Sequence, residues 1–202
     1  MSTTTPPPSG GAPHARGSIL HGFRAAAVDL WGQSGLDAVA SRLPLATRVA
    51  TIDPIVLPFE WIPLEHVVAW HDALWAGPVG ADERELARFI GRSIELGFGR
   101  FKSAFFTGIT ADRLIGRSQE LWRYQHTHGE VTVEVEGSKG TVTLRNHPYV
   151  EHACSRRVTA ESYRYIVTMT GAQDVTAAWG AGAAGTGMGA GGSLVVQLSW
   201  RA

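Results

Sequence analysis

Several features that mark particular classes of protein are missing from this sequence. Its 202 residues include a single cysteine, so the chain forms no internal disulfide, and a reducing compartment is expected. Eighteen basic residues balance eighteen acidic ones, without the clustered positive field that a nucleic-acid surface needs. The N-terminus lacks a secretory pattern, and the first long apolar stretch is interrupted by Arg24 and Asp29. We therefore expect a cytoplasmic protein that neither spans a membrane nor binds nucleic acid.

The composition otherwise predicts a folded domain. Hydrophobic residues make up 44% of the chain and charged residues 18%, which is typical of a globular protein with a full core. Residues 1–17 differ, because they are mostly Pro, Gly, Ser and Thr with little to bury. We expect a disordered tail over residues 1–17 and a single α/β domain over residues 18–202.

Helical periodicity dominates residues 18–127. Apolar residues recur at helical spacing from Ile19 to Trp31, and Gly32 ends that helix. Three prolines between residues 51 and 66 predict an extended connection, and Pro63 suits the first turn of the next helix. Five helices are expected, at residues 18–31, 35–43, 63–75, 81–99 and 110–127.

After Gly129 the period changes to two. Val131, Val133 and Val135 alternate with polar residues, and a Gly-Ser-Lys-Gly turn follows, which predicts a hairpin with one solvent-facing side. A helix at residues 159–171 and strands at 174–179 and 193–200 complete the pattern. The predicted fold class is α/β of the α+β type. An N-terminal helical lobe (18–127) would pack on a C-terminal antiparallel sheet of about four strands with one intervening helix (hairpin-helix-hairpin, 128–202).

Several spacings carry a resemblance to a known superfamily. They are Trp61 and Pro63 after the Pro-rich connection, "GRSIELGFGRF", the helix-to-hairpin junction "LWRYQHTHGEVTVEVEGSKGTVTLRNHP", and the closing "LVVQLSW". Across roughly residues 17–202 the chain resembles haem nitric-oxide-binding domains, vinyl-reductase-type sensor domains and TRAPP vesicle-tethering subunits. It is most similar to a family of paralogues expanded in myxobacteria. The resemblance implies an apolar ligand pocket between the sheet and the helical lobe, while the fold alone leaves the function open.

Residues 126–154 contain four of the eight histidines and the only cysteine. Histidines two residues apart on a strand point the same way, so a zinc ion is one interpretation. No CxxC or HExxH motif accompanies these histidines. Their presence is explained equally well by a helix C-terminus, where a partial positive charge near the carbonyl groups is favourable. We expect no metal; the candidates would be His126, His128, His147 and His152, with Cys154 as a further ligand. We interpret His147, the residue before Pro148, as part of a structural turn at the end of a strand.

His71 lies on the apolar stripe of the helix at 63–75. A polar ring there either makes a hydrogen bond in the core or faces a pocket, where it would suit an axial haem ligand. The resemblance implies that the haem-binding relatives bind the haem propionates through a Tyr-x-Ser-x-Arg motif. That motif is not found here, and the segment beginning at Tyr163 does not match it. We therefore expect no haem cofactor. The chain also has seven tryptophans, of which most would be core and some would line a pocket. The pocket candidates are His71, Trp61, Trp75, Trp122 and Tyr163.

No catalytic constellation is apparent. The glycine-rich loop at 180–192 joins two strands and holds no charge, so it is not a phosphate cradle. Cys154 is read as a small buried hydrophobe rather than as a nucleophile. The leading hypothesis is a non-enzymatic sensory or regulatory module that binds a small apolar ligand or a protein partner and self-associates. The alternatives are an assembly protein with no ligand and, third, a haem or metal sensor.

Overall fold

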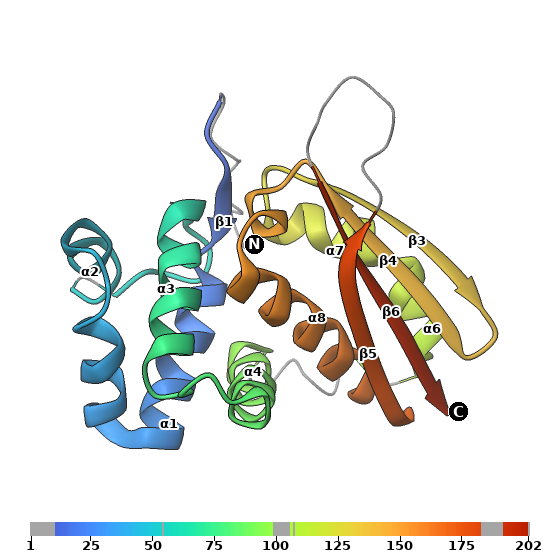
Figure 1. Ribbon diagram of the computed structural model, residues 1–202, viewed down its shortest axis with the longest axis horizontal. Helices are drawn as coiled ribbons and strands as arrows, with labels where there is room; N and C mark the ends of the chain where they lie inside the picture. The colour runs from blue at the N-terminus through green and yellow to red at the C-terminus, as the bar shows by residue number, and fades with distance from the viewer. Residues whose placement is uncertain (1–10, 54, 99–105, 107, 183–191, 202) are drawn as a thin grey trace. The chain divides into compact units, whose positions relative to one another are not determined.

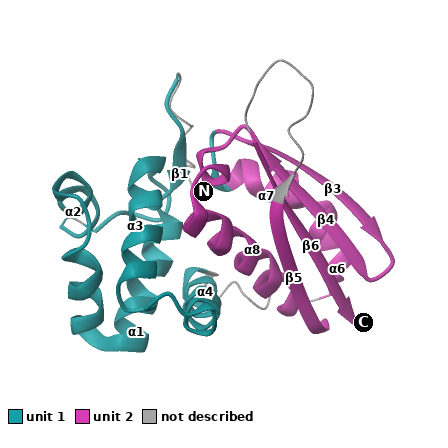
Figure 2. Cartoon of the chain, in the orientation of Figure 1, with its two compact units in different colours: residues 1–99, 125–127 teal, residues 100–124, 128–202 magenta. Residues whose placement is uncertain are grey.

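The computed structural model describes residues 11–53, 55–98, 106, 108–182 and 192–201. It has the predicted α+β architecture, with an N-terminal helical region and a C-terminal four-stranded antiparallel sheet (Figure 1). The chain divides into two compact units, shown in Figure 2. Unit 1 comprises residues 1–99 and 125–127, and unit 2 comprises residues 100–124 and 128–202. The single domain expected over residues 18–202 stays a prediction.

Unit 1 combines helices with a short two-stranded sheet. Strand β1 pairs antiparallel with β2, so that Ala15 faces Ile62. Helix α1 packs against α4 closely enough that a Cβ on Gly22 would lie 2.6 Å from the carbonyl oxygen of Ser93. The elements are β1 (His14–Arg16), α1 (Ser18–Ala40), α2 (Leu45–Thr51), β2 (Trp61–Pro63), α3 (Leu64–Ala76) and α4 (Glu83–Phe98).

Helix α1 is broken where the sequence predicts. Gly32 has a φ of 69° and a ψ of −172°, which interrupts an otherwise helical run. A positive φ is readily adopted only by glycine. The two successive helices expected on either side of Gly32 are therefore confirmed as the two arms of α1.

The expected tail of residues 1–17 extends too far. Its first ten residues lie outside the described part of the chain, but His14–Arg16 form β1, with Ala15 fully buried. The guanidinium of Arg16 lies 3.8 Å from the centre of the Trp61 ring, and its Nη1 donates a hydrogen bond to the Phe59 carbonyl at 2.7 Å. The composition misled the prediction, because a three-residue strand has no periodicity and its partner lies far along the chain.

Unit 2 is built on the sheet β3-β4-β6-β5, in which all neighbouring strands are antiparallel. Helices α6 and α8 contact these strands on the face that carries the buried Val142, Leu144 and Val196. On the other face Glu134, Thr141 and Gln197 lie side by side in register, as expected for a hairpin with one solvent-facing side. The elements are α6 (Ala111–Gly116), α7 (Ser118–Gln125), β3 (Glu130–Glu136), β4 (Lys139–Arg145), a 3-10 turn (Pro148–Val150), α8 (Ala153–Thr168), β5 (Gln173–Gly182) and β6 (Ser193–Arg201).

Several helix boundaries differ from those expected, and helix α2 was not expected at all. The helix predicted at 110–127 is divided into α6 and α7, because Arg117 has a φ of −93° and a ψ of 6°. Helix α8 begins six residues earlier than predicted, at Ala153 instead of 159. Most of the glycine-rich loop, residues 183–191, lies outside the described residues. Within the described ranges, no helix is both long enough and apolar enough to cross a membrane.

Candidate ligand-binding site

The burial of His71 in unit 1 follows from the stripe of apolar residues along α3. Pro63 precedes the helix with a φ of −54°, so its ring suits the helix start. The residues on the stripe of His71, which is itself 1% exposed, are also buried. These neighbours are Leu64, Val67, Val68 and Leu74. The helical register expected for His71 is therefore confirmed.

A row of aromatic rings continues from His71 through the helices of unit 1. The ring of Phe23 on α1 lies 5.6 Å from that of His71 and 5.5 Å from that of Phe89 on α4. Trp31 then stacks on Phe89, with 5.3 Å between centroids and only 3° between planes. We call Trp31, Phe89, Phe23 and His71 the aromatic row. Aromatic walls of this kind supply contact area for a planar or apolar ligand. Sequence reasoning missed Phe89, although its spacing on a strongly amphipathic helix carried the signal.

Polar contacts to α2 tie down the other side of α3. The indole Nε1 of Trp70 donates to the Thr51 hydroxyl at 2.9 Å, and the Thr47 hydroxyl lies 3.0 Å from Nδ1 of His66. Trp70 and both threonines are buried. A buried polar group needs such a partner, so these bonds set the rotation of α3 and with it the direction of His71.

The other two unit 1 candidates occupy different surroundings. Trp61, on β2, lies beneath the Arg16 guanidinium, a cation-π arrangement that ties β1 to β2. Trp75 is half-buried near the end of α3. Trp61 is therefore held in a structural contact.

Trp122 belongs to a second aromatic group, in unit 2. Its Nε1 donates to the His128 carbonyl at 2.8 Å, and its ring meets that of His147 edge-on at 4.9 Å. The His147 ring meets Tyr149 edge-on at 4.4 Å, and its Nδ1 accepts the Tyr149 backbone N–H at 3.3 Å. His147 thereby caps the 3-10 turn, which confirms the structural turn expected before Pro148. Burial raises the pKa of the Tyr149 hydroxyl above its ordinary value.

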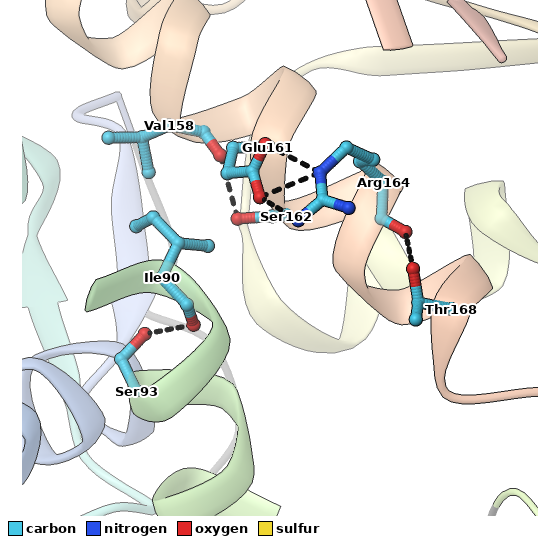
Figure 3. A network of polar contacts seen from close by, with 7 residues as sticks. All are labelled: Ile90, Ser93, Val158, Glu161, Ser162, Arg164 and Thr168. Carbon is cyan, nitrogen blue, oxygen red and sulfur yellow. Dashed lines mark hydrogen bonds and ion pairs between the residues drawn. The ribbon is translucent and has the colours of Figure 1, made fainter. Parts of the chain in front are cut away.

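Tyr163 lies on α8 of unit 2. Burial raises the pKa of its hydroxyl to about 12, and a hydrogen bond with the Ser118 side chain acts in the opposite direction. Beside it on the same helix, Arg164 donates hydrogen bonds to Oε1 of Glu161 from Nε at 2.9 Å and from Nη2 at 2.6 Å (Figure 3). That hydrogen bonding raises the pKa of Arg164. Tyr163 is thus neutral at ordinary pH and can act as a hydrogen-bond group.

The histidines of the stretch 126–154 are distributed over different surroundings. His126 is buried in unit 1, where it forms an isolated bridge with Ala15. His128 belongs to unit 2, and His152 is exposed just before α8. Over the part of the chain that the structure describes, no group of three or more His, Cys, Asp or Glu side chains is arranged to hold a metal ion.

Comparison with known proteins identifies the architecture. No family model matches the sequence, and no curated protein matches it. Solved structures do match: an oxygen-binding H-NOX domain related to soluble guanylate cyclases, in its oxygen complex, has a TM-score of 0.59 and 11% identity. The alignment covers 93% of this chain and 95% of that one. The fold is the H-NOX fold. An Fe(II) unliganded H-NOX protein from K. algicida agrees, with a TM-score of 0.59, 9% identity, and 93% and 97% of the two chains covered.

These matches correct the expectation that no cofactor is involved. One matched structure was determined to probe heme distortion in the H-NOX family (TM-score 0.62, 11% identity, 93% and 95% coverage). Another concerns heme redox potential and porphyrin distortion. The expectation rested on the missing Tyr-x-Ser-x-Arg motif. That motif concerns the propionates, whereas the iron is held by an axial side chain, so its absence did not exclude haem.

Unit 1 contains a side chain suited to the iron of a haem. The neutral imidazole is the commonest protein ligand for iron-group metals, and the buried His71 at one end of the aromatic row fits that chemistry. Within unit 1, a buried imidazole beside aromatic rings is therefore a donor of the kind that haem iron takes.

Proposed function

We propose that this protein is a non-enzymatic sensory module that binds a small ligand, with haem as its cofactor. The observation that carries the proposal is the match to H-NOX domains over 93% of the chain, together with a fully buried histidine in the helical unit. When bound, haem would supply an iron centre able to take up a diatomic gas, as in the oxygen complex of the matched domain.

His71 would be the side chain that holds the haem iron. Its position is set by α3 and by the Trp70 and His66 contacts to α2, so the ring needs little reorganisation. Phe23 lies against the same ring and would help to exclude water from it. The same proposal includes two narrower statements. The chain belongs to a paralogue family expanded in myxobacteria, and the module binds a small ligand or a protein partner.

The test is haem titration of the purified protein followed by absorption spectroscopy. We expect one haem per chain, with a sharp Soret band whose position shifts when the His71 ligand is removed in His71→Gly. Free imidazole should restore the wild-type spectrum to this variant, because it can occupy the space left by the side chain.

A matched control is His21→Gly, since His21 is an exposed histidine on α1. It should leave the haem spectrum unchanged. If wild-type protein takes up no stoichiometric haem, the haem proposal is wrong. If it takes up haem and His71→Gly gives the wild-type spectrum, His71 is not the ligand.

A second candidate function is an assembly protein without a ligand. A set of large apolar side chains on α2 and on the connection before β2 is exposed, which is typical of an interaction surface. These side chains are Leu45, Val49, Ile55, Leu57 and Phe59. A protein that stays colourless in the titration above and elutes with a partner would favour this candidate.

A further inference from the structure

The two edges of the unit 2 sheet differ in their chemistry. Strands β3 and β5 each have one hydrogen-bonded neighbour within the described residues. Strand β3 bears three exposed glutamates, at 130, 134 and 136, which is a common protection against pairing with another chain. Strand β5 has no charged residue and no proline from Val175 to Gly182. A long, uncharged edge of this kind presents free backbone groups to an incoming strand.

The side chains of β5 are small on the sheet face opposite α6 and α8. Ala178 pairs with the exposed Gln197 of β6, so both lie on that face, and Ala178 is itself exposed. Gly180, two residues along, is exposed as well. Small side chains here leave room for another strand to approach.

The helix-covered side of β5 carries one large and partly exposed ring. Trp179 pairs with the buried Val196 and is still 37% exposed. The guanidinium carbons of Arg156 and Arg157 on α8 lie 5.8 Å and 5.3 Å from its centroid. The neighbouring residue on the same face, Ala177, is small. On this face of β5, the bulky ring of Trp179 therefore lies next to the small side chain of Ala177. The space beside Ala177 can accept a ring from another strand.

We propose that β5 is a dimerisation edge, at which two copies of this chain pair antiparallel about a twofold axis through Ala178. In that register Ala178 faces its own copy, and Trp179 of each chain lies opposite Ala177 of the other. Thr176 then lies opposite Gly180. A large side chain meets a small one in both directions, as an isologous interface requires. This self-complementarity favours a second copy over an unrelated strand.

The pairing joins two four-stranded sheets into one continuous eight-stranded sheet. It provides hydrogen-bond partners for the backbone groups along the outer side of β5, and it covers the exposed part of Trp179. Arg156 and Arg157 bring like charges towards the axis from both sides, so the association is best measured at about 0.15 M salt, where the Debye length is about 8 Å. The proposal does not depend on haem binding.

The test measures oligomeric state by light scattering and sedimentation over a concentration series up to about 100 µM, typical of moderate self-association. We expect wild-type protein at twice the 21.7 kDa chain mass. Ala178→Lys and Ala178→Glu each place like charges directly opposite one another, so each should shift dissociation to at least tenfold higher concentration. An equimolar mixture of the two variants should recover the dimer, because Lys then faces Glu.

The matched control is Thr132→Lys, which places the same charge at an exposed position on β3, the opposite edge. It should dimerise like wild type, and circular dichroism should show all variants folded. A monomeric wild type overturns the proposal, as does equal disruption by Thr132→Lys. An Ala178→Lys variant that dimerises like wild type also overturns it. Failure of the charge-swapped mixture to recover the dimer overturns the twofold register.

Discussion

Gly129 offers a sharp test of the Trp122 group in unit 2. It has a φ of 92°, a region that side-chain-bearing residues rarely adopt. A Cβ at this position would lie 2.8 Å from Nε1 of Trp122 and 3.1 Å from Cδ2 of His147. Gly129→Ala therefore combines a strained backbone with an overpacked contact.

The expected loss of stability follows from the separate contributions. The backbone strain costs about 1–2 kcal/mol. Overpacking against rings that cannot withdraw costs about 1–3 kcal/mol, and weakening the Trp122 hydrogen bond to the His128 carbonyl costs about 1 kcal/mol. Because these three contributions overlap, we expect the free energy of unfolding to fall by about 3 kcal/mol in total. This loss lowers the Tm by about 6–12 °C for a chain of this size.

Gly137→Ala separates the two effects. Gly137 also has a positive φ, 57°, but a Cβ added there would meet no other atom within 4 Å, so only backbone strain applies. We expect a loss of about 1–2 kcal/mol. Thermal and urea unfolding, followed by circular dichroism and tryptophan fluorescence, measure both variants. Equal losses in the two variants would refute the argument, because the Trp122 group would then yield freely to the added methyl.

The remaining predictions concern the N-terminus and acid stability. Deleting residues 1–16 removes β1 and should lower the Tm markedly, whereas deleting residues 1–10 leaves β1 in place and should retain the wild-type Tm; equal melting of the two would show that β1 contributes nothing. Asp29 accepts hydrogen bonds from Arg92, which lowers the pKa of its carboxyl. The stabilisation is present above the ordinary carboxyl pKa, about 4, and is lost as the pH falls through the lowered value. Asp29→Asn should therefore unfold more readily than wild type at pH 7, and the difference in stability should shrink as the pH is lowered below about 4; a difference that stays constant down to the acid limit of the titration would contradict this.

Much of the secondary structure follows from local patterns. The stripe of α3, the break at Gly32 and the alternation of β3 each depend on residues within one element, so spacing alone predicts them. The burial of His71 followed from the same stripe. His147 as a turn residue followed from the proline after it.

The sequence by itself determined most of the segments that form helices and strands and which of their faces are apolar, because these depend on neighbours within a few residues; the short elements β1, α2 and β2 were not among them. Only the tertiary structure decided that Arg16 lies on Trp61, that Phe89 and Trp31 extend the aromatic row from His71, and that Arg117 divides a helix. It also decided that β5 is an edge strand, since strand order is a property of the whole sheet. Such contacts join residues far apart along the chain, and their free energy depends on distances that no local pattern encodes.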